Sequence, residues 1–215
     1  MTNIQFNSPA DLQAGLTIHL EENTLMALTF LSFLGIMKKR QLARFFNPNK
    51  VNQQIKNLIR HELITKEGYE NHIIYKLAPI GIKRIKKVPL LLQKKDYIKS
   101  IVIAELITRL NEITPVTPIG KKGNYRIIKV SNIELYIAYE KQNIDFYKGK
   151  KHILVGRTLY DLKQHTFTNE FVRFALEEEI FSLNTDRLFY RYDNEWIKEV
   201  NKMFSKSIQE RNHDI

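Results

Sequence analysis

Five polar side chains between positions 49 and 60 recur at spacings that place them on one side of a helix. They are Asn49, Gln53, Lys56, Asn57 and Arg60. Asn and Gln can pair with adenine in the DNA major groove, and Arg and Lys can pair with guanine. This face holds no acid, whereas a helix face that only meets solvent usually mixes acids with bases. We therefore predict that these five residues read base edges, with a plain surface helix as the alternative interpretation.

The other side of the same helix is apolar. Val51, Ile55, Leu58 and Ile59 recur at i, i+4, i+7 and i+8, which is the pattern of a stripe that faces a core. Asn47-Pro48 supplies a capping residue followed by a proline for the first turn. The sequence therefore predicts a helix over residues 48–61.

The neighbouring segments predict the elements that must hold this helix in place. We expect helices over 24–34 and 37–46 before it, and strands over 63–66 and 72–77 after it, around a turn at 67–71. Two helices, a third amphipathic helix and a hairpin follow one another in the order of a winged helix-turn-helix. We assign that domain to residues 24–88, preceded by an N-terminal arm at 1–23.

Positive charge is concentrated in and just after these elements. Residues 36–99 hold 16 Lys+Arg and 4 Asp+Glu, a net charge of +12, whereas the whole chain carries +11. Localised positive charge on a small helical module is typical of a nucleic-acid binder. The residues predicted to contact the DNA backbone are Lys38, Lys39, Arg40, Arg44, Tyr69, Asn71, His72, Lys83, Arg84, Lys86 and Lys87. Glu67 and Glu70, near the hairpin tip, oppose this prediction mildly.

The second half of the chain predicts an α+β domain. An amphipathic helix from Asp96 to Glu112, within the segment 94–112, should connect the two halves or form a dimerisation surface, and burial against the second half is the alternative. Residues 114–120 have the composition of a linker. Residues 120–208 then predict a small domain of unassigned role with a mainly antiparallel sheet. Its expected strands are 125–130, 133–139, 144–147, 152–155 and 187–192, and its expected helices are 169–181 and 194–207.

The first half also resembles a known family. The runs LTIHLEENTLMAL, KKRQLARFF, NLIRHELITK and YKLAPIGIKRI, within residues 16–85, resemble the opening of the plasmid replication-relaxation family of Gram-positive mobile elements. Tyr75, Leu77 and Gly81 match that family's pattern, and Ala78 stands where the family usually has Thr. The resemblance implies a winged helix and a role in plasmid replication, relaxation or mobilisation. It also implies that a nuclease-like second half occurs in some members.

No constellation of residues predicts catalysis. A magnesium-dependent nuclease site needs an acid on one strand and an acid and a lysine one residue apart on the next. Glu134, Glu140, Lys141 and Asp145 come nearest, but Glu140 and Lys141 are adjacent and would point to opposite faces of a strand. The run at 177–179 should be solvated, and the six histidines lack the spacing of metal ligands. We predict no enzyme activity, no metal and no cofactor.

Composition indicates a cytoplasmic protein. There are no cysteines, no basic segment followed by an apolar run at the N-terminus, and no apolar window of the about 20 residues that span a bilayer. The leading hypothesis is a sequence-specific double-stranded DNA-binding protein that regulates transcription or controls plasmid replication or mobilisation. Its further partners would be a second copy of the chain or a replication or mobilisation protein, with no membrane contact. The alternatives are a metal-dependent nuclease or relaxation accessory, and a winged-helix module for protein contacts.

Overall fold

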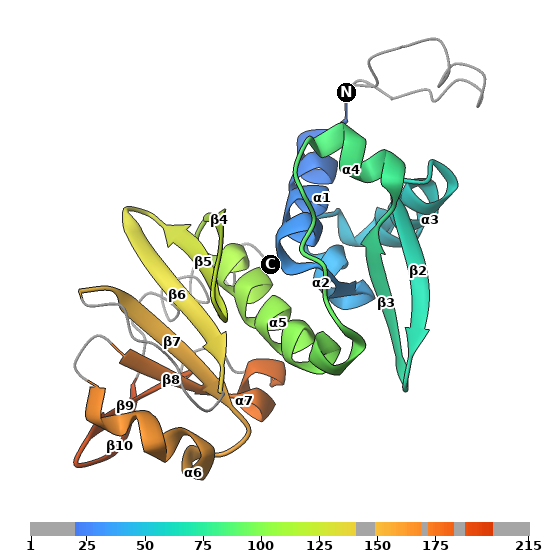
Figure 1. Ribbon diagram of the computed structural model, residues 1–215. Helices are drawn as coiled ribbons and strands as arrows, with labels where there is room; N and C mark the ends of the chain where they lie inside the picture. The colour runs from blue at the N-terminus through green and yellow to red at the C-terminus, as the bar shows by residue number, and fades with distance from the viewer. Residues whose placement is uncertain (1–19, 141–148, 169–171, 183–187, 200–215) are drawn as a thin grey trace.

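The protein is a mixed α+β structure. The computed structural model describes residues 20–140, 149–168, 172–182 and 188–199. Within these ranges the chain forms seven α-helices, a small three-stranded antiparallel sheet and a larger seven-stranded mixed sheet (Figure 1). The predicted fold class is thereby confirmed at this level.

The small sheet and most of the helices come from the first part of the chain. In chain order its elements are α1 (Glu22–Leu34), β1 (Met37–Lys38), α2 (Lys39–Ala43), α3 (Val51–Arg60), β2 (Ile64–Tyr69), β3 (His72–Leu77) and α4 (Pro79–Ile85). The strands lie in the order β1-β3-β2, with β3 paired to both neighbours. The sheet therefore unites a two-residue strand ahead of α2 with the hairpin that follows α3.

Local sequence accounts for the ends of these helices. Gly35 has φ +81° after α1, and its N–H donates to Leu31 O over 2.9 Å, which ends the helix in a conformation that favours glycine. Asn47 Oδ1 accepts from Asn49 N over 3.0 Å and starts a 3₁₀ turn at Pro48–Lys50 that leads into α3. The Asn47 cap thus begins the segment expected to be helical over 48–61, of which residues 48–50 form a 3₁₀ turn and 51–60 form α3.

Helix α5 (Tyr97–Ile113) is the centre of the molecule. Every residue from Ser100 to Leu110 is buried, so the helix is covered on all sides. Figure 1 shows α5 between the helices of the first part and the large sheet. This burial is the alternative that the sequence left open, and it leaves no apolar face over these residues for dimerisation.

The large sheet comes from the second part of the chain. Its strands are β4 (Val116–Lys122), β5 (Tyr125–Val130), β6 (Ile133–Tyr139), β7 (Lys151–Gly156), β8 (Val172–Leu176), β9 (Phe189–Asp193) and β10 (Glu195–Glu199). They lie side by side in sequence order. The β6–β7 and β7–β8 pairs are parallel and the others are antiparallel, so the sheet is mixed at its centre. The register of β4 shifts between Pro118 and Gly120.

Each face of the large sheet packs against its own core. Ile128, Ile137 and Ile153 lie in one cluster with residues of α1 and α5. The opposite face holds a second cluster that includes Leu154 and Phe174, covered in part by α6 (Leu159–Leu162). Because the first cluster extends from the helices into the sheet, the two parts share a hydrophobic core.

Several sequence predictions fail in the second part. The helix expected over 169–181 is instead strand β8 followed by the short helix α7 (Glu177–Phe181), and residues 169–171 lie outside the described ranges. The helix expected over 194–207 begins as strand β10, and its remainder from 200 is not described. β8 pairs with β7 and β10 pairs with β9, so neighbours across the sheet override local helix propensity.

Other boundaries also differ from the predictions. Most of the expected linker at 114–120 belongs to β4, so the sheet begins before the expected domain boundary at 120. The second helix is shorter than expected because its first two residues form β1, and helix α4 was not expected. The strand expected at 144–147, and most of the arm expected at 1–23, lie outside the described residues.

Gly81 provides a test of the packing of α4 against the hairpin. A Cβ built on Gly81 would lie 2.1 Å from Leu63 O, a backbone atom that cannot rotate away. We expect Gly81→Ala to lower the free energy of unfolding by about 1–3 kcal/mol, as overpacking does. Gly68→Ala is the matched control, because nothing lies within 4 Å of its Cβ position. Urea denaturation checks both variants, and equal stability of Gly81→Ala and wild type would contradict this packing.

Candidate nucleic-acid interface

Helix α3 presents a polar face that the core holds in place. Ile55 and Leu58 are each 4% exposed and belong to the main hydrophobic cluster. Gln53, Lys56 and Arg60 are exposed on the other side. The structure thus brings together three of the five predicted base-reading residues on one helix and directs them to solvent.

The other two predicted base-reading residues differ in their surroundings. Asn49 is exposed in the 3₁₀ turn ahead of α3, and Asn57 is half-buried. Gln53 and Asn57 line a cleft of about 170 Å³ between α3 and the start of α1, with Glu21 on its opposite side. Glu21 places a negative charge near this end of the face.

The hairpin of β2 and β3 is anchored on the protein by aromatic contacts. The rings of Tyr69 and Tyr97 lie 4.9 Å apart, and Lys76 Nζ bonds to both Glu67 and the Tyr97 hydroxyl. Tyr69, predicted to contact the DNA backbone, is half-buried with its ring against Tyr97. Lys76 in turn offsets the charge of Glu67, one of the two acids that oppose the prediction.

Other predicted backbone-contact residues lie at the surface. Asn71, at the hairpin turn, is exposed, while His72 is half-buried. On and after α4, the exposed residues are Lys83, Lys86 and Lys87, and Arg84 is half-buried. Figure 1 shows α3, the hairpin and α4 on the side of the molecule away from the large sheet. The basic residues of these elements are consequently not covered by the second part.

Two arginines of the α2 segment, Arg40 and Arg44, reach toward α5, contrary to what a row of phosphate contacts would require. Arg40 and Arg44 bond to Glu105 of α5, and the Arg40 guanidinium lies 4.6 Å from the centre of the Phe181 ring. Lys38 is half-buried, with Nζ 5.8 Å from the same ring. Lys39 and Arg40 both stand at exposed positions, and the Arg40 side chain is 49% exposed although it bonds to Glu105.

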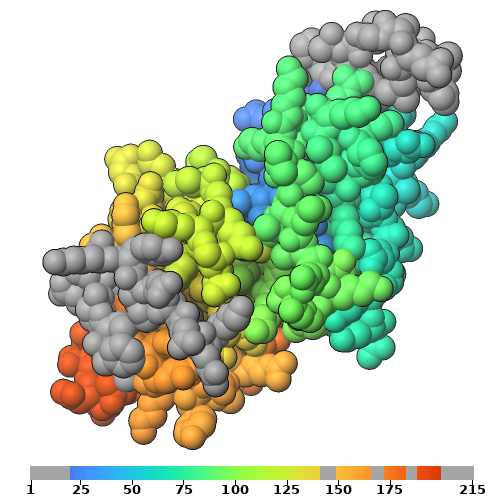
Figure 2. Space-filling view, in the orientation of Figure 1, coloured from blue at the N-terminus to red at the C-terminus, as the bar shows by residue number. Residues whose placement is uncertain are grey.

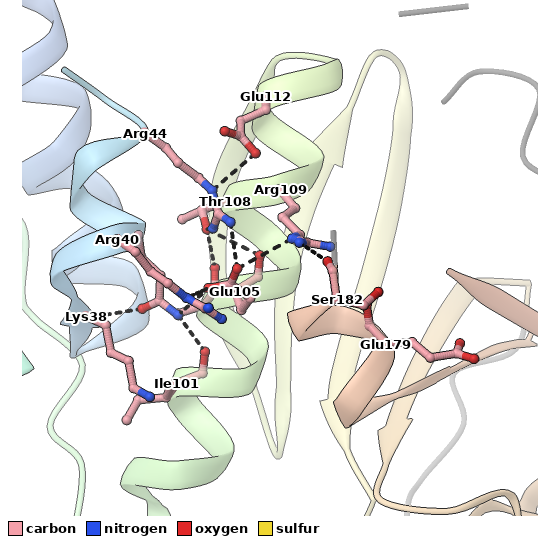
Figure 3. Close-up of polar contacts among 12 residues, drawn as sticks. Lys38, Arg40, Arg44, Ile101, Glu105, Thr108, Arg109, Glu112, Glu179 and Ser182 are labelled. Atoms are coloured by element: carbon pink, nitrogen blue, oxygen red, sulfur yellow. Dashed lines mark hydrogen bonds and ion pairs between the residues drawn. The ribbon is translucent and has the colours of Figure 1, made fainter. Parts of the chain in front are cut away.

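Glu105 is the hub of this inward cluster (Figure 3). Its side chain is 1% exposed, and Oε1 accepts from Arg44 Nη2 over 2.6 Å. Oε2 accepts from Arg40 Nε and from Gln41 Nε2, each over 3.1 Å. Arg109 Nε lies 3.5 Å from Oε1, one helical turn along α5. Three guanidinium groups and an amide thus surround one buried carboxylate.

The cluster extends from α2 across α5 to the large sheet's side of the molecule. Arg109 also donates from Nη2 to the backbone oxygen of Ser182, directly after α7. Arg44 donates from Nη1 to Thr108 Oγ1 over 2.7 Å and pairs with Glu112 over 3.1 Å. Helices α2, α5 and α7 are therefore fixed to one another by polar contacts as well as by the core.

The pKa of the Glu105 carboxyl is shifted by opposing effects. Burial by itself raises the pKa of this carboxyl, but the hydrogen bond and charge of Arg44, with Gln41 and Arg40, outweigh it. The net pKa lies below its ordinary value of 4.5, so the carboxylate is ionised at neutral pH.

Sequence reasoning missed this cluster. The only signal is an acid and a base four residues apart, Glu105 and Arg109, inside the otherwise apolar run IVIAELITRL. Charges at that spacing share one side of a helix, and within a buried helix they require partners. The partners come from α2, more than 60 positions earlier, where the sequence showed basic residues suited to phosphate.

The acidic residues considered for catalysis have structural partners. Glu134 accepts from Lys150 over 2.9 Å and Glu140 from Gln164 over 2.9 Å, while Lys141 and Asp145 lie outside the described residues. Glu177 and Glu179 accept from the hydroxyls of Tyr139 and Tyr190. Among the described residues no three His, Asp or Glu side chains gather as metal ligands would. The nuclease hypothesis gains no support from these contacts.

Comparisons with known proteins add no relative. Neither a family model nor a curated protein matches the chain. In the described part of the chain, no helix is long and apolar enough to cross a membrane. The resemblance to the plasmid replication-relaxation family stays a prediction.

The buried carboxylate yields a stability prediction. Glu105→Gln leaves Arg40, Arg44 and Arg109 without their shared counter-charge and should cost about 3 kcal/mol of unfolding free energy. Glu112→Gln is the matched control on the same helix, because Glu112 is 41% exposed and should contribute less than about 1 kcal/mol. Chemical denaturation measures both, and similar losses for the two variants would contradict the central role of Glu105.

The lowered pKa of Glu105 also predicts a pH dependence. A carboxyl with a lowered folded-state pKa contributes stability above its unfolded pKa and loses it as the pH falls through the folded value. The difference in unfolding free energy between wild type and Glu105→Gln should therefore be constant near neutral pH and shrink below pH 4.5. Denaturation over a pH series measures this difference. A difference that grows on acidification would show that the carboxylate is not stabilised by its partners.

Proposed function

We propose that this protein binds double-stranded DNA in a sequence-specific manner through residues 24–88, acting as a winged helix-turn-helix. Helix α3 would enter the major groove, and the hairpin tip and α4 would contact the backbone on either side. The order α1, α2, α3 and the β2–β3 hairpin, with β1 completing the small sheet, is compatible with that domain.

The exposed face of α3 is the observation that carries the proposal. Gln53, Lys56 and Arg60 project to solvent from a ten-residue helix that is buried at Ile55 and Leu58, while Ile59, expected to face the core, is 36% exposed. A side chain reads a base edge only when its helix is held rigidly, and the core contacts of Ile55 and Leu58 supply that support. Amide and basic groups on this face match the donors and acceptors of purines in the major groove.

The basic residues that face solvent define a narrower set of backbone contacts than the sequence predicts. Arg44 and Tyr69 are half-buried in contacts within the protein and leave the proposed interface, and Arg40, although exposed, is held by Glu105. Besides Arg40, five exposed residues remain from the predicted set: Lys39, Asn71, Lys83, Lys86 and Lys87. Phosphate contacts from such residues would set affinity and register and make binding depend on salt.

The biological role would follow from the DNA site. The resemblance to the plasmid replication-relaxation family favours control of plasmid replication or mobilisation, and a bare winged helix is equally suited to transcriptional regulation. Immunoprecipitation of the protein with its DNA, followed by sequencing, separates these roles. Sites at a replication or transfer origin would favour the first, and sites at promoters the second.

Substitutions on α3 and α4 should affect binding differently. With a selected duplex, Gln53→Ala and Arg60→Ala should each lose about 1–3 kcal/mol of discrimination against a scrambled duplex. Lys86→Ala should weaken binding to both duplexes alike and reduce the salt slope by about 1. Fluorescence anisotropy over a salt series measures these effects.

The control is Lys151→Ala, an exposed lysine in β7 of the large sheet, which should leave binding unchanged. Equal losses on both duplexes for the two α3 variants would remove α3 from the recognition role. Absence of duplex binding even at low salt would refute the proposal and favour a module for protein contacts, because exposed charge of this density binds DNA non-specifically there.

A further inference from the structure

A second basic site lies between the segment that leads into α5 and the β4–β5 hairpin. A cavity of about 360 Å³ opens there, lined on one side by residues of the segment 91–103 and on the other by Lys121, Asn124 and Arg126 of the hairpin together with Tyr139 of β6. Figure 2 shows the green chain after α4 against the yellow-green surface of β4 and β5. Its volume falls within the range of small-molecule sites.

The charge of the cavity wall is strongly positive. Four cations line it, Lys95, Lys99, Lys121 and Arg126, against a single carboxylate, that of Asp96. The cations come from both sides, two from the segment around the start of α5 and two from the β4–β5 hairpin. Repulsion among them is relieved only in part by Asp96, so an anion would be stabilised between them.

Arg126 distinguishes this cavity from a patch of surface lysines. It is 5% exposed, and its Nε has no hydrogen-bond partner among the described residues. Burial lowers the pKa of its guanidinium to about 10, and Asp96 offsets this only partly. None of its three guanidinium nitrogens lies within 4.0 Å of a carboxylate oxygen of the described residues, as a buried guanidinium would normally require.

We propose that this cavity binds a small phosphate-bearing molecule, with Arg126 holding the phosphate at its base. A guanidinium offers parallel N–H donors that match phosphate oxygens, and Lys95, Lys99 and Lys121 add charge around it. Leu91, Leu92 and Ile103 in the same wall provide apolar surface for the organic part of the molecule. The ligand supplies the counter-charge that Arg126 lacks within the described protein.

Binding at this site connects two parts of the chain. The Lys95–Lys99 side belongs to the segment between α4 and α5, and the Lys121–Arg126 side belongs to the large sheet. A ligand that pairs with both sides stabilises their contact, and so raises the melting temperature of the full chain. The inference does not rest on DNA binding by α3, and its test uses neither α3 variants nor a selected duplex.

Calorimetric titration of the full chain with pyrophosphate and with ATP tests the site. Wild type should bind at least one of them, and Arg126→Met should weaken binding by about tenfold or more. Lys121→Gln, at an exposed position that folding does not require, should weaken it less. The matched control is Lys129→Gln, an exposed residue three positions along β5 from Arg126 and outside the cavity, which should bind as wild type does.

The melting temperature separates a ligand-binding role from a structural one. Without ligand, Arg126→Met should melt no lower than wild type, because it removes an uncompensated buried charge. Loss of both folding stability and binding in Arg126→Met, with full binding by Lys121→Gln, would overturn the proposal. Absence of binding by wild type at millimolar pyrophosphate and ATP would overturn it as well.

A parallel titration distinguishes the source of the phosphate. A random duplex and a 5′-phosphorylated single strand are titrated into wild type and Arg126→Met. Weaker binding of these nucleic acids by the variant, with no small-molecule binding by wild type, would assign Arg126 to a nucleic-acid backbone and overturn the small-molecule assignment. Unchanged nucleic-acid binding together with lost ATP binding supports it.

Discussion

The buried carboxylate of Glu105 constrains how the helices of the first part sit against α5 and the large sheet. A charge with 1% side-chain exposure is tolerated only if its partners stay within bonding distance, and here they come from α2 and α5 themselves. Arg109 carries the same network on to the backbone beyond α7. A rotation of the small sheet and its helices relative to the large sheet would pull these groups apart. The two parts of the chain are therefore expected to move as one body, joined through α5 by both apolar and ionic contacts.

This constraint sorts the positive charge of the first half into two populations. Arg44 and the half-exposed Arg40 pair with Glu105 and balance its charge, so they stabilise the fold. The lysines and the arginine on α3 and after α4 are exposed, and within the described ranges they form no salt bridge with an acid. A net charge counted along the sequence does not distinguish the basic residues that pair with Glu105 from those that are exposed. Only their positions in space show which residues remain available to a polyanionic partner.

Periodicity predicts the elements that have a strong local pattern. The stripe of Ile55 and Leu58 locates α3, and the alternation in 125–130 and 133–139 locates β5 and β6. It fails at β8 and β10, five-residue strands whose state depends on pairing with β7 and β9. The exposed polar face of α3 follows from local periodicity and was predicted, whereas the surroundings of Glu105 and Arg126 depend on residues distant in sequence. A charged residue in an apolar run signals that partners exist, but not where they lie.

The outer strand β4 has a consequence for how copies of this protein can associate. It forms one edge of the large sheet, its register shifts between Pro118 and Gly120, and Lys121 and Lys122 follow at exposed positions. Proline cannot donate a backbone hydrogen bond, a bulge twists the edge, and lysines repel their counterparts on an approaching strand. This edge is thus protected against continuation of the sheet from one molecule into the next. An assembly of several copies would have to be built through another surface, and the chain is guarded on this side against aggregation by strand addition.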